Sequence, residues 1–151
     1  MENASVYEVL QLAIKIEEEG VKFYNHWASS ATGKIEETFK KLAMDEMEHK
    51  YYFKGLYDNL KKNPEVNYLF EEEASAYFKD YAISAAFNRE QVKLNSVKDA
   101  VEEGILTEKR SIDYYELLSK HAQQSTKEML GKIIKEEEQH KVILEKLLLE
   151  V

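Results

Sequence analysis

The apolar positions of this chain recur at intervals of three and four residues, the spacing that places side chains on one face of an α-helix. The pattern predicts four long helices, at about residues 5–30, 34–62, 97–122 and 125–150. The turn sequence SSATG follows the first helix, and Asn63-Pro64 stops the second. Between the second and third helices, residues 64–95 also have helical periodicity. We expect this segment to be a long helical crossover.

A serine followed three residues later by an acidic residue marks the start of three predicted helices. In such a capping box the two side chains bind backbone amides that have no partner within the helix. The pairs are Ser5 with Glu8, Ser96 with Asp99, and Ser125 with Glu128. We therefore expect serine caps on the first, third and fourth helices.

Each predicted helix has one apolar stripe of the kind that faces the inside of a bundle. Every stripe is interrupted near its middle by a glutamate, and the stripes of the second and fourth helices also carry a histidine. The six residues are Glu17, Glu46, His49, Glu108, Glu137 and His140. Each glutamate pair within a hairpin is separated by 29 residues centred on the predicted turn. In two antiparallel hairpins, all four glutamates would therefore lie at mid-height.

Four carboxylates inside a bundle require a compensating positive charge. Moving one unpaired carboxylate into an apolar interior costs roughly several kcal/mol, so four would consume the ~5–15 kcal/mol of a typical domain's stability. The four stripes contain no lysine or arginine. Two divalent cations would neutralise the carboxylates, and two imidazoles would complete the ligand set. The sequence therefore predicts a dinuclear metal site formed by these six residues.

The two halves of the chain repeat with an offset of 91 residues. The offset superposes Glu17 on Glu108, Tyr24 on Tyr115, Glu46 on Glu137, and His49 on His140. A pseudo-twofold axis would unite the two half-sites if the second and third helices run parallel, which requires the long crossover. We expect Tyr24 and Tyr115 to pack in the core and donate a hydrogen bond to a ligand carboxylate, in preference to a redox-active role.

Composition narrows the classes of function. A chain of 151 residues with 44% hydrophobic content supports one core, so we expect residues 1–151 to form a single domain. The absence of cysteine excludes disulfides, thiolate zinc sites and cysteine nucleophiles. The net charge of −8 argues against nucleic acid and anionic membranes as partners. No signal peptide or membrane-spanning stretch is recognisable, so we expect a cytoplasmic protein.

Polar residues beside the stripes are assigned to the surface. The acidic residues that flank the predicted ligands, and that we expect to be solvated, are Glu18, Glu19, Asp45, Glu48, Glu136 and Glu138. His26 and His121 have no counterpart in the repeat, and we expect surface roles for both.

The ligand pattern resembles the ferritin-like superfamily, in which two helices each supply a glutamate and two others each supply Glu-x-x-His. The rubrerythrin branch is the most similar. It shares the patterns Ala13-x-x-x-Glu17-x-x-Gly20-x-x-x-Tyr24 and Asp45-Glu46-x-Glu48-His49, and the similarity extends from Val6 to Leu148. The resemblance implies an all-α, ferritin-like four-helix bundle of two antiparallel hairpins.

The resemblance also implies a role for each ligand. Glu17 and Glu108 would be terminal carboxylates, and Glu46 and Glu137 would bridge the metals. His49 and His140 would each bind one metal ion. Two iron ions are implied by the resemblance alone, because manganese and zinc accept the same ligands.

The implied activity is redox chemistry with hydrogen peroxide or dioxygen as the small-molecule oxidant. Rubrerythrins carry a cysteine-bound iron and an additional glutamate where this chain has Ser111, and this chain has no cysteine. An external electron-transfer protein would therefore be needed.

The alternatives are an iron-storage protein of bacterioferritin type, a di-manganese catalase-like centre, and a vestigial site, which the intact ligand set disfavours. We expect a homodimer or larger homo-oligomer. Met47 occupies a position similar to a haem-binding methionine of bacterioferritins, but an ordinary, partly exposed methionine is the preferred interpretation.

Overall fold

The computed structural model describes residues 6–62 and 94–151. Within these ranges the chain forms four helices and no strands: α1 (Val6–Ala28), α2 (Gly33–Lys62), α4 (Val97–Lys120) and α5 (Gln124–Leu148). The four predicted helices are confirmed, and their ends shift by at most two residues in the described part of the chain. The Ser5 cap and almost all of the crossover at 64–95 lie outside the described residues and stay predictions.

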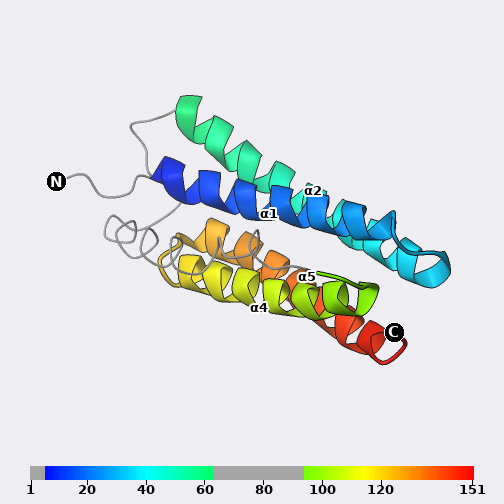
Figure 1. Cartoon of the computed structure of the whole chain (residues 1–151). Coiled ribbons are helices and arrows are strands. Elements are labelled where there is room, and N and C mark those ends of the chain that lie inside the picture. The colour runs from blue at the N-terminus through cyan, green and yellow to red at the C-terminus, as the bar shows by residue number, and fades with distance from the viewer. Residues whose placement is uncertain (1–5, 63–93) are drawn as a thin grey trace.

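The helices pack as two antiparallel hairpins, α1 with α2 and α4 with α5 (Figure 1). Asp45 on α2 contacts His140 on α5, and Lys34 near the start of α2 contacts Glu150 just after the end of α5. Residue numbers therefore run in opposite directions along these two helices. The tyrosine contacts described below show that α1 and α4 are also antiparallel. Each helix therefore runs opposite to both neighbours, and α2 is parallel to α4. This confirms the all-α bundle and the orientation that the repeat requires.

The apolar core consists of two clusters on either side of the polar residues at mid-height. One cluster includes Leu10, Phe53, Tyr115, Leu118 and Leu130, and the other includes Phe39, Leu42, Val101, Leu144 and Leu147. Burying each large apolar side chain contributes about 1.5–3 kcal/mol. The polar layer is thus enclosed along the bundle axis by two stable apolar clusters.

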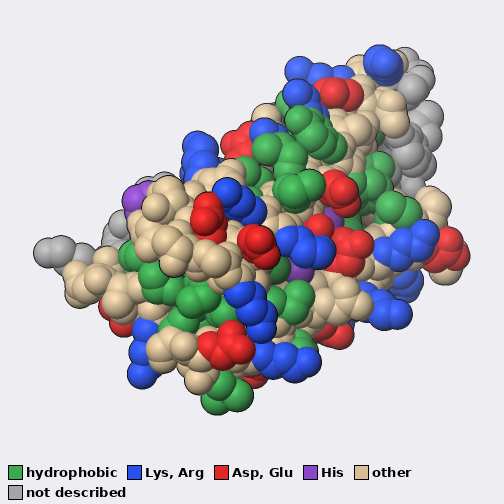
Figure 2. Space-filling model, turned by 90° about the vertical axis from the view of Figure 1, so that its right-hand side faces the viewer, with side chains coloured by type: hydrophobic (Ala, Val, Ile, Leu, Met, Phe, Trp, Pro, Cys, Tyr) green, Lys and Arg blue, Asp and Glu red, His purple; other side chains and the backbone are tan. Residues whose placement is uncertain are grey.

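The molecular surface mixes charges of both signs. Figure 2 shows lysine and arginine side chains interspersed with aspartate and glutamate over the face at the right-hand side of Figure 1. Among the helices of the described residues, none combines the length and the apolar character needed to cross a membrane.

The helix ends show which local signals determine the boundaries. Ser96 caps α4 as predicted, and its Oγ accepts a hydrogen bond from the backbone N–H of Asp99 at 3.1 Å. The predicted capping box at Ser125 is wrong, because α5 begins one residue earlier. Gln123 occupies the cap position without a side-chain hydrogen bond, and Ser125 lies inside the first turn. Gly33 starts α2 with a φ of 62°, a conformation that favours glycine.

Replacing the two serines separates the cap that forms from the one that does not. Ser96→Ala removes the bond to Asp99 and is expected to lower the free energy of unfolding by about 1 kcal/mol. Ser125→Ala removes no cap and is expected to change it by less than about 0.5 kcal/mol. Urea unfolding monitored by circular dichroism measures both values. Equal losses in the two variants would contradict the assignment of the caps.

Candidate metal centre

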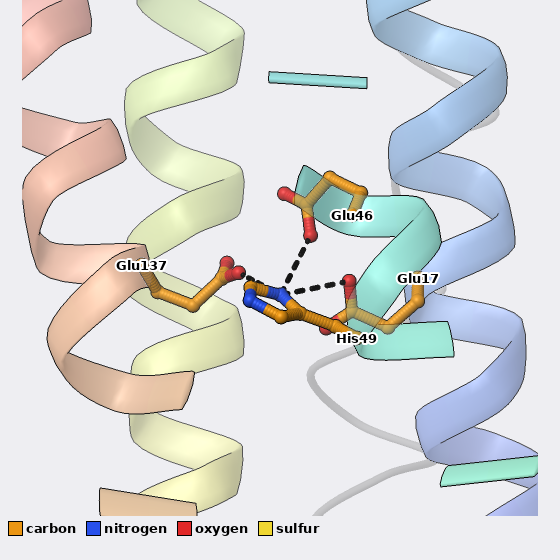
Figure 3. A group of neighbouring side chains, drawn as sticks. All are labelled: Glu17, Glu46, His49 and Glu137. Atoms are coloured by element: carbon orange, nitrogen blue, oxygen red, sulfur yellow. Dashed lines mark ion pairs between the residues drawn. The ribbon is translucent and has the colours of Figure 1, made fainter. Parts of the chain in front are cut away.

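The six predicted ligand residues lie together at the centre of the bundle. Each has an exposed fraction of 4% or less. They form two groups whose potential ligand atoms lie within 4.8 Å of one another: Glu17, Glu46, His49 and Glu137 in the first, and Glu46, Glu108, Glu137 and His140 in the second. Figure 3 shows the first group, in which the His49 ring points between carboxylates from three different helices. Glu46 and Glu137 belong to both groups and can bridge them.

The imidazole nitrogens have distinct surroundings. His49 Nδ1 lies 2.8 Å from Glu137 Oε1 and 3.5 Å from Glu17 Oε2. His140 Nδ1 lies 3.6 Å from Glu108 Oε1 and 3.8 Å from Glu137 Oε1. The two rings stack with centroids 6.1 Å apart. In both histidines Nδ1 therefore faces the carboxylates, and Nε2 points outward.

Buried polar atoms without a hydrogen-bond partner indicate whether the residues of the centre could hold metal ions. Burying a polar group without a hydrogen bond costs about 1–3 kcal/mol, and more for a charged group. In the part of the chain that the structure describes, six buried atoms at this centre have no hydrogen-bond partner: Glu17 Oε2, His49 Nδ1, Glu108 Oε2, Glu137 Oε1, Glu137 Oε2 and His140 Nδ1. All six are oxygen or nitrogen donors of the kind that iron, manganese and zinc accept. The donor set fits a dinuclear metal site.

Tyr24 and Tyr115 link the two hairpins through the terminal glutamates. The Tyr24 hydroxyl donates to Glu108 Oε1 at 2.5 Å, and the Tyr115 hydroxyl donates to Glu17 Oε1 at 2.6 Å. Burial, and then the negative charge of Glu17, raise the pKa of Tyr115 well above its usual value, so its hydroxyl stays protonated. Each bond occupies one carboxylate oxygen and leaves Oε2 unpartnered.

Two acidic residues assigned to solvent contact the histidines instead. Asp45 Oδ2 lies 2.9 Å from His140 Nε2, and Glu136 Oε2 lies 2.5 Å from His49 Nε2. The expectation of purely solvated side chains is wrong for both, although their side chains remain 25% and 49% exposed. Because each precedes a stripe glutamate, its side chain reaches the seam between α2 and α5. The 91-residue offset of the repeat superposes Asp45 on Glu136. This match is the signal in the sequence that could have identified both as partners of the histidines.

These contacts determine which nitrogen can bind a metal. A carboxylate only accepts hydrogen bonds, so Nε2 of each histidine carries the hydrogen and donates it. The neutral imidazole then presents the Nδ1 lone pair to the centre. Carboxylate partners of this kind orient metal-binding histidines and make them more basic.

The other singled-out residues lie away from the centre. His26 is exposed in the last turn of α1, and His121 is half-buried at the end of α4. Neither joins the two ligand groups found among the described residues. Met47 is half-buried on α2.

Electrostatics show that the metal-free centre holds protons. Burial, followed by the charges of neighbouring carboxylates, raises the pKa of Glu17, Glu108 and Glu137. Burial acts to lower the pKa of His140, but the nearby carboxylates of Glu108 and Glu46, at 3.6 and 3.7 Å from Nδ1, outweigh it and raise the pKa to about 10. Binding of metal ions must displace these protons, because a ligand nitrogen or carboxylate binds metal in its deprotonated form.

The fold and the centre together define a class of protein. A bundle of two antiparallel hairpins that gathers four glutamates and two histidines at mid-height is the arrangement of ferritin-like dinuclear carboxylate proteins. The family model described as rubrerythrin matches residues 8–148. The chain belongs to the rubrerythrin family.

A solved structure supports this assignment. The chain is similar to a protein from Thermotoga maritima described as a ferritin-like diiron-carboxylate protein, with 25% sequence identity and a TM-score of 0.71. The similarity covers 99% of this chain and 98% of that protein. No curated protein sequence matches this chain.

The outward carboxylates are expected to strengthen metal binding. Asp45→Asn combined with Glu136→Gln keeps side-chain size but removes the charge that orients both histidines. Metal affinity is expected to fall by about 10–100-fold, measured by chelator competition with Zn²⁺ or Mn²⁺. Glu48→Gln combined with Glu138→Gln is the matched control, since both residues are exposed on the same helices. Equal affinities in the two double variants would refute this role.

Metal binding is expected to strengthen as pH rises. The pKa values of Glu17, Glu137 and His140 are raised in the metal-free protein, so this centre carries protons at pH 7 that each bound ion releases. The dissociation constant should therefore fall between about pH 6 and pH 8, and calorimetry in buffers of different ionisation enthalpy should detect proton release. Affinity independent of pH, without proton release, would contradict the assigned protonation.

Proposed function

We propose that this protein binds two iron ions at its centre and reduces hydrogen peroxide or dioxygen with electrons from an external protein donor. The observation that carries the proposal is the set of six unpartnered carboxylate and imidazole atoms, enclosed between two apolar clusters. Unpaired charges of this kind destabilise a fold unless metal ions neutralise them. Membership of the rubrerythrin family and similarity to a diiron-carboxylate protein support the choice of iron.

The geometry suggests a role for each ligand. Glu46 and Glu137 would bridge the two ions, because both belong to each ligand group. Glu17 and Glu108 would be terminal ligands through Oε2, since their other oxygens accept bonds from the tyrosines. The two histidines would each bind one ion through Nδ1.

The protein's own residues position ligands and exclude bulk water. A bound iron pair supplies one-electron redox steps, by changing between the ferrous and ferric states. Tyr24 and Tyr115 hold the terminal carboxylates in place by hydrogen bonds that cross between hairpins. Asp45 and Glu136 keep the histidine tautomers that expose Nδ1 to the centre.

The electrons would have to come from outside these 151 residues. The sequence contains no cysteine, so it cannot hold a thiolate-bound iron as an internal donor. An external electron-transfer protein and assembly into a homodimer or larger homo-oligomer are parts of the proposal. So is a cytoplasmic location.

Two other functions would use the same donor set. Manganese accepts carboxylate and imidazole ligands as readily as iron, so a di-manganese catalase-like centre is the main alternative. Storage of iron is the other, and it requires far more than two ions per assembled chain. Comparing hydrogen peroxide loss catalysed by the iron-loaded and manganese-loaded proteins, with and without a reductant, separates these functions. Loss that depends on iron and reductant supports the proposed activity.

Removing the two shared carboxylates is expected to abolish the dinuclear site. After anaerobic ferrous loading, the wild type should retain two ions per chain and gain thermal stability, because metal binds the folded state. Glu46→Ala combined with Glu137→Ala should retain less than about one ion per chain and gain no stability. Elemental analysis and calorimetry give both values.

The control for this variant is Glu48→Ala combined with Glu138→Ala. Both residues are exposed and lie on the same helices as Glu46 and Glu137. This control should bind two ions. Equal, substoichiometric metal in the wild type and the Glu46/Glu137 variant would refute the dinuclear site.

A further inference from the structure

Helix α4 carries a second series of buried polar side chains next to the metal ligands. Glu103, Thr107 and Ser111 follow one another at intervals of four residues, with exposed fractions of 6%, 3% and 5%. Four residues advance slightly more than one helical turn, so the series winds gradually around the helix. It ends at Ser111, which lies one turn beyond Glu108 on the inward stripe. The series therefore runs from the flank of α4 to the metal centre.

Within residues 6–62 and 94–151, two atoms in this series have no hydrogen-bond partner. They are Glu103 Oε1 and Thr107 Oγ1, and both are buried. Glu103 Oε1 lies 3.6 Å from Nη1 of Arg110, whose side chain is 38% exposed, so the series approaches solvent there. Buried polar atoms normally have protein or water partners, and unpartnered ones call for a functional or solvent explanation.

The repeat shows that packing does not require polar residues here. The positions 91 residues earlier, on α1, are Leu12, Ile16 and Gly20. The half of the bundle that contains them thus packs with two apolar residues and a glycine. Replacing unpartnered polar groups with apolar ones of the same shape commonly stabilises a protein. The two halves of the bundle therefore differ at these positions, and a gain in folding stability does not explain why α4 has polar residues there.

The proposed reaction creates a need for protons at the centre. Reduction of hydrogen peroxide to two water molecules breaks the O–O bond and consumes two electrons and two protons. A bound iron pair would supply the two electrons, one from each ion. The metal centre lies between two apolar clusters, and its ligand residues are at most 4% exposed. Protons from solvent must therefore cross buried protein to reach the oxidant.

We infer that Glu103, Thr107 and Ser111 form a proton path from the solvent near Arg110 to the metal centre. This inference rests on the proposed function. Neighbouring side chains in the series are one helical turn apart, at about 5–6 Å between Cβ atoms, a gap that one bridging water molecule can span. The Glu103 carboxyl takes a proton from solvent and passes it inward.

Each hydroxyl on the path relays one proton at a time. The Thr107 oxygen accepts a proton on one side while its own hydrogen leaves on the other, and Ser111 repeats the exchange toward the oxidant. A hydroxyl can do this because it is both a donor and an acceptor. Every group returns to its original protonation state after each transfer.

The test replaces Thr107 with a residue of the same shape that cannot relay protons. In Thr107→Val, the single-turnover rate of the ferrous-loaded protein with hydrogen peroxide should fall about 10-fold or more, with a larger solvent deuterium isotope effect. Iron content should remain two per chain. The melting temperature of the metal-free protein should rise by roughly 2–4 °C, because an unpartnered buried hydroxyl is removed.

Thr38→Val is the matched control. Thr38 is half-buried on α2, away from the ligand groups, and its hydroxyl donates to the Lys34 carbonyl oxygen in a solvent-exposed hydrogen bond. This variant should keep the wild-type rate and isotope effect. Glu103→Gln is the second test variant, since the amide preserves shape but does not relay a proton as a carboxyl does, and its rate should also fall about 10-fold or more.

The outcomes separate the path from the proposed function. Wild-type rates in both Thr107→Val and Glu103→Gln, with two irons bound, would overturn the path while leaving the dinuclear site intact. Loss of iron from both variants would also overturn it, because the residues would then serve assembly of the site. A wild type that binds two irons but does not react with peroxide would refute the proposed function itself.

Discussion

The burial of four carboxylates and two imidazoles at one point is the constraint on which the rest of the structure depends. Carboxylate oxygens of the ligand groups lie within 4.8 Å of one another, so their charges repel, and burial removes the water that would screen them. The bundle tolerates this because pKa values rise, protons are retained, and the donor atoms face inward where metal ions can bind them. The two apolar clusters supply the stability that the polar layer lacks.

The contacts around the centre hold its two halves in register. Tyr24 of the first hairpin donates a hydrogen bond to Glu108 of the second, and Tyr115 of the second hairpin donates one to Glu17 of the first. Each hairpin therefore needs the other to hold its terminal glutamate. Asp45 and Glu136 make the equivalent crossing between α2 and α5 through the histidines. Each of these contacts has an equivalent at the positions related by the 91-residue offset, and every one of them joins the two hairpins. The repeat is not kept at Glu103 and Thr107, whose counterparts on α1 are apolar. In the described part of the chain, these two residues each have a buried polar atom without a hydrogen-bond partner.

Much of the fold and the centre could be predicted from the sequence because both follow from periodicity. Intervals of three and four residues place Glu46 and His49 on one helix face whatever surrounds that helix. The failed prediction at Ser125 has a different origin. Its spacing to Glu128 fits a capping box, but α5 starts at Gln124, and a serine within the first turn cannot act as its cap.

The sequence by itself determined the four helices, the inward position of the six candidate ligands and the correspondence between the two halves, because these depend on spacing along one chain. Only the tertiary structure decided which groups meet across helices. Three features depend on how the hairpins are rotated and spaced: Tyr24 reaches Glu108, Asp45 orients His140, and the buried Thr107 hydroxyl has no hydrogen-bond partner among the described residues. Helical periodicity gives the face of a residue, whereas the packed bundle decides what lies opposite it.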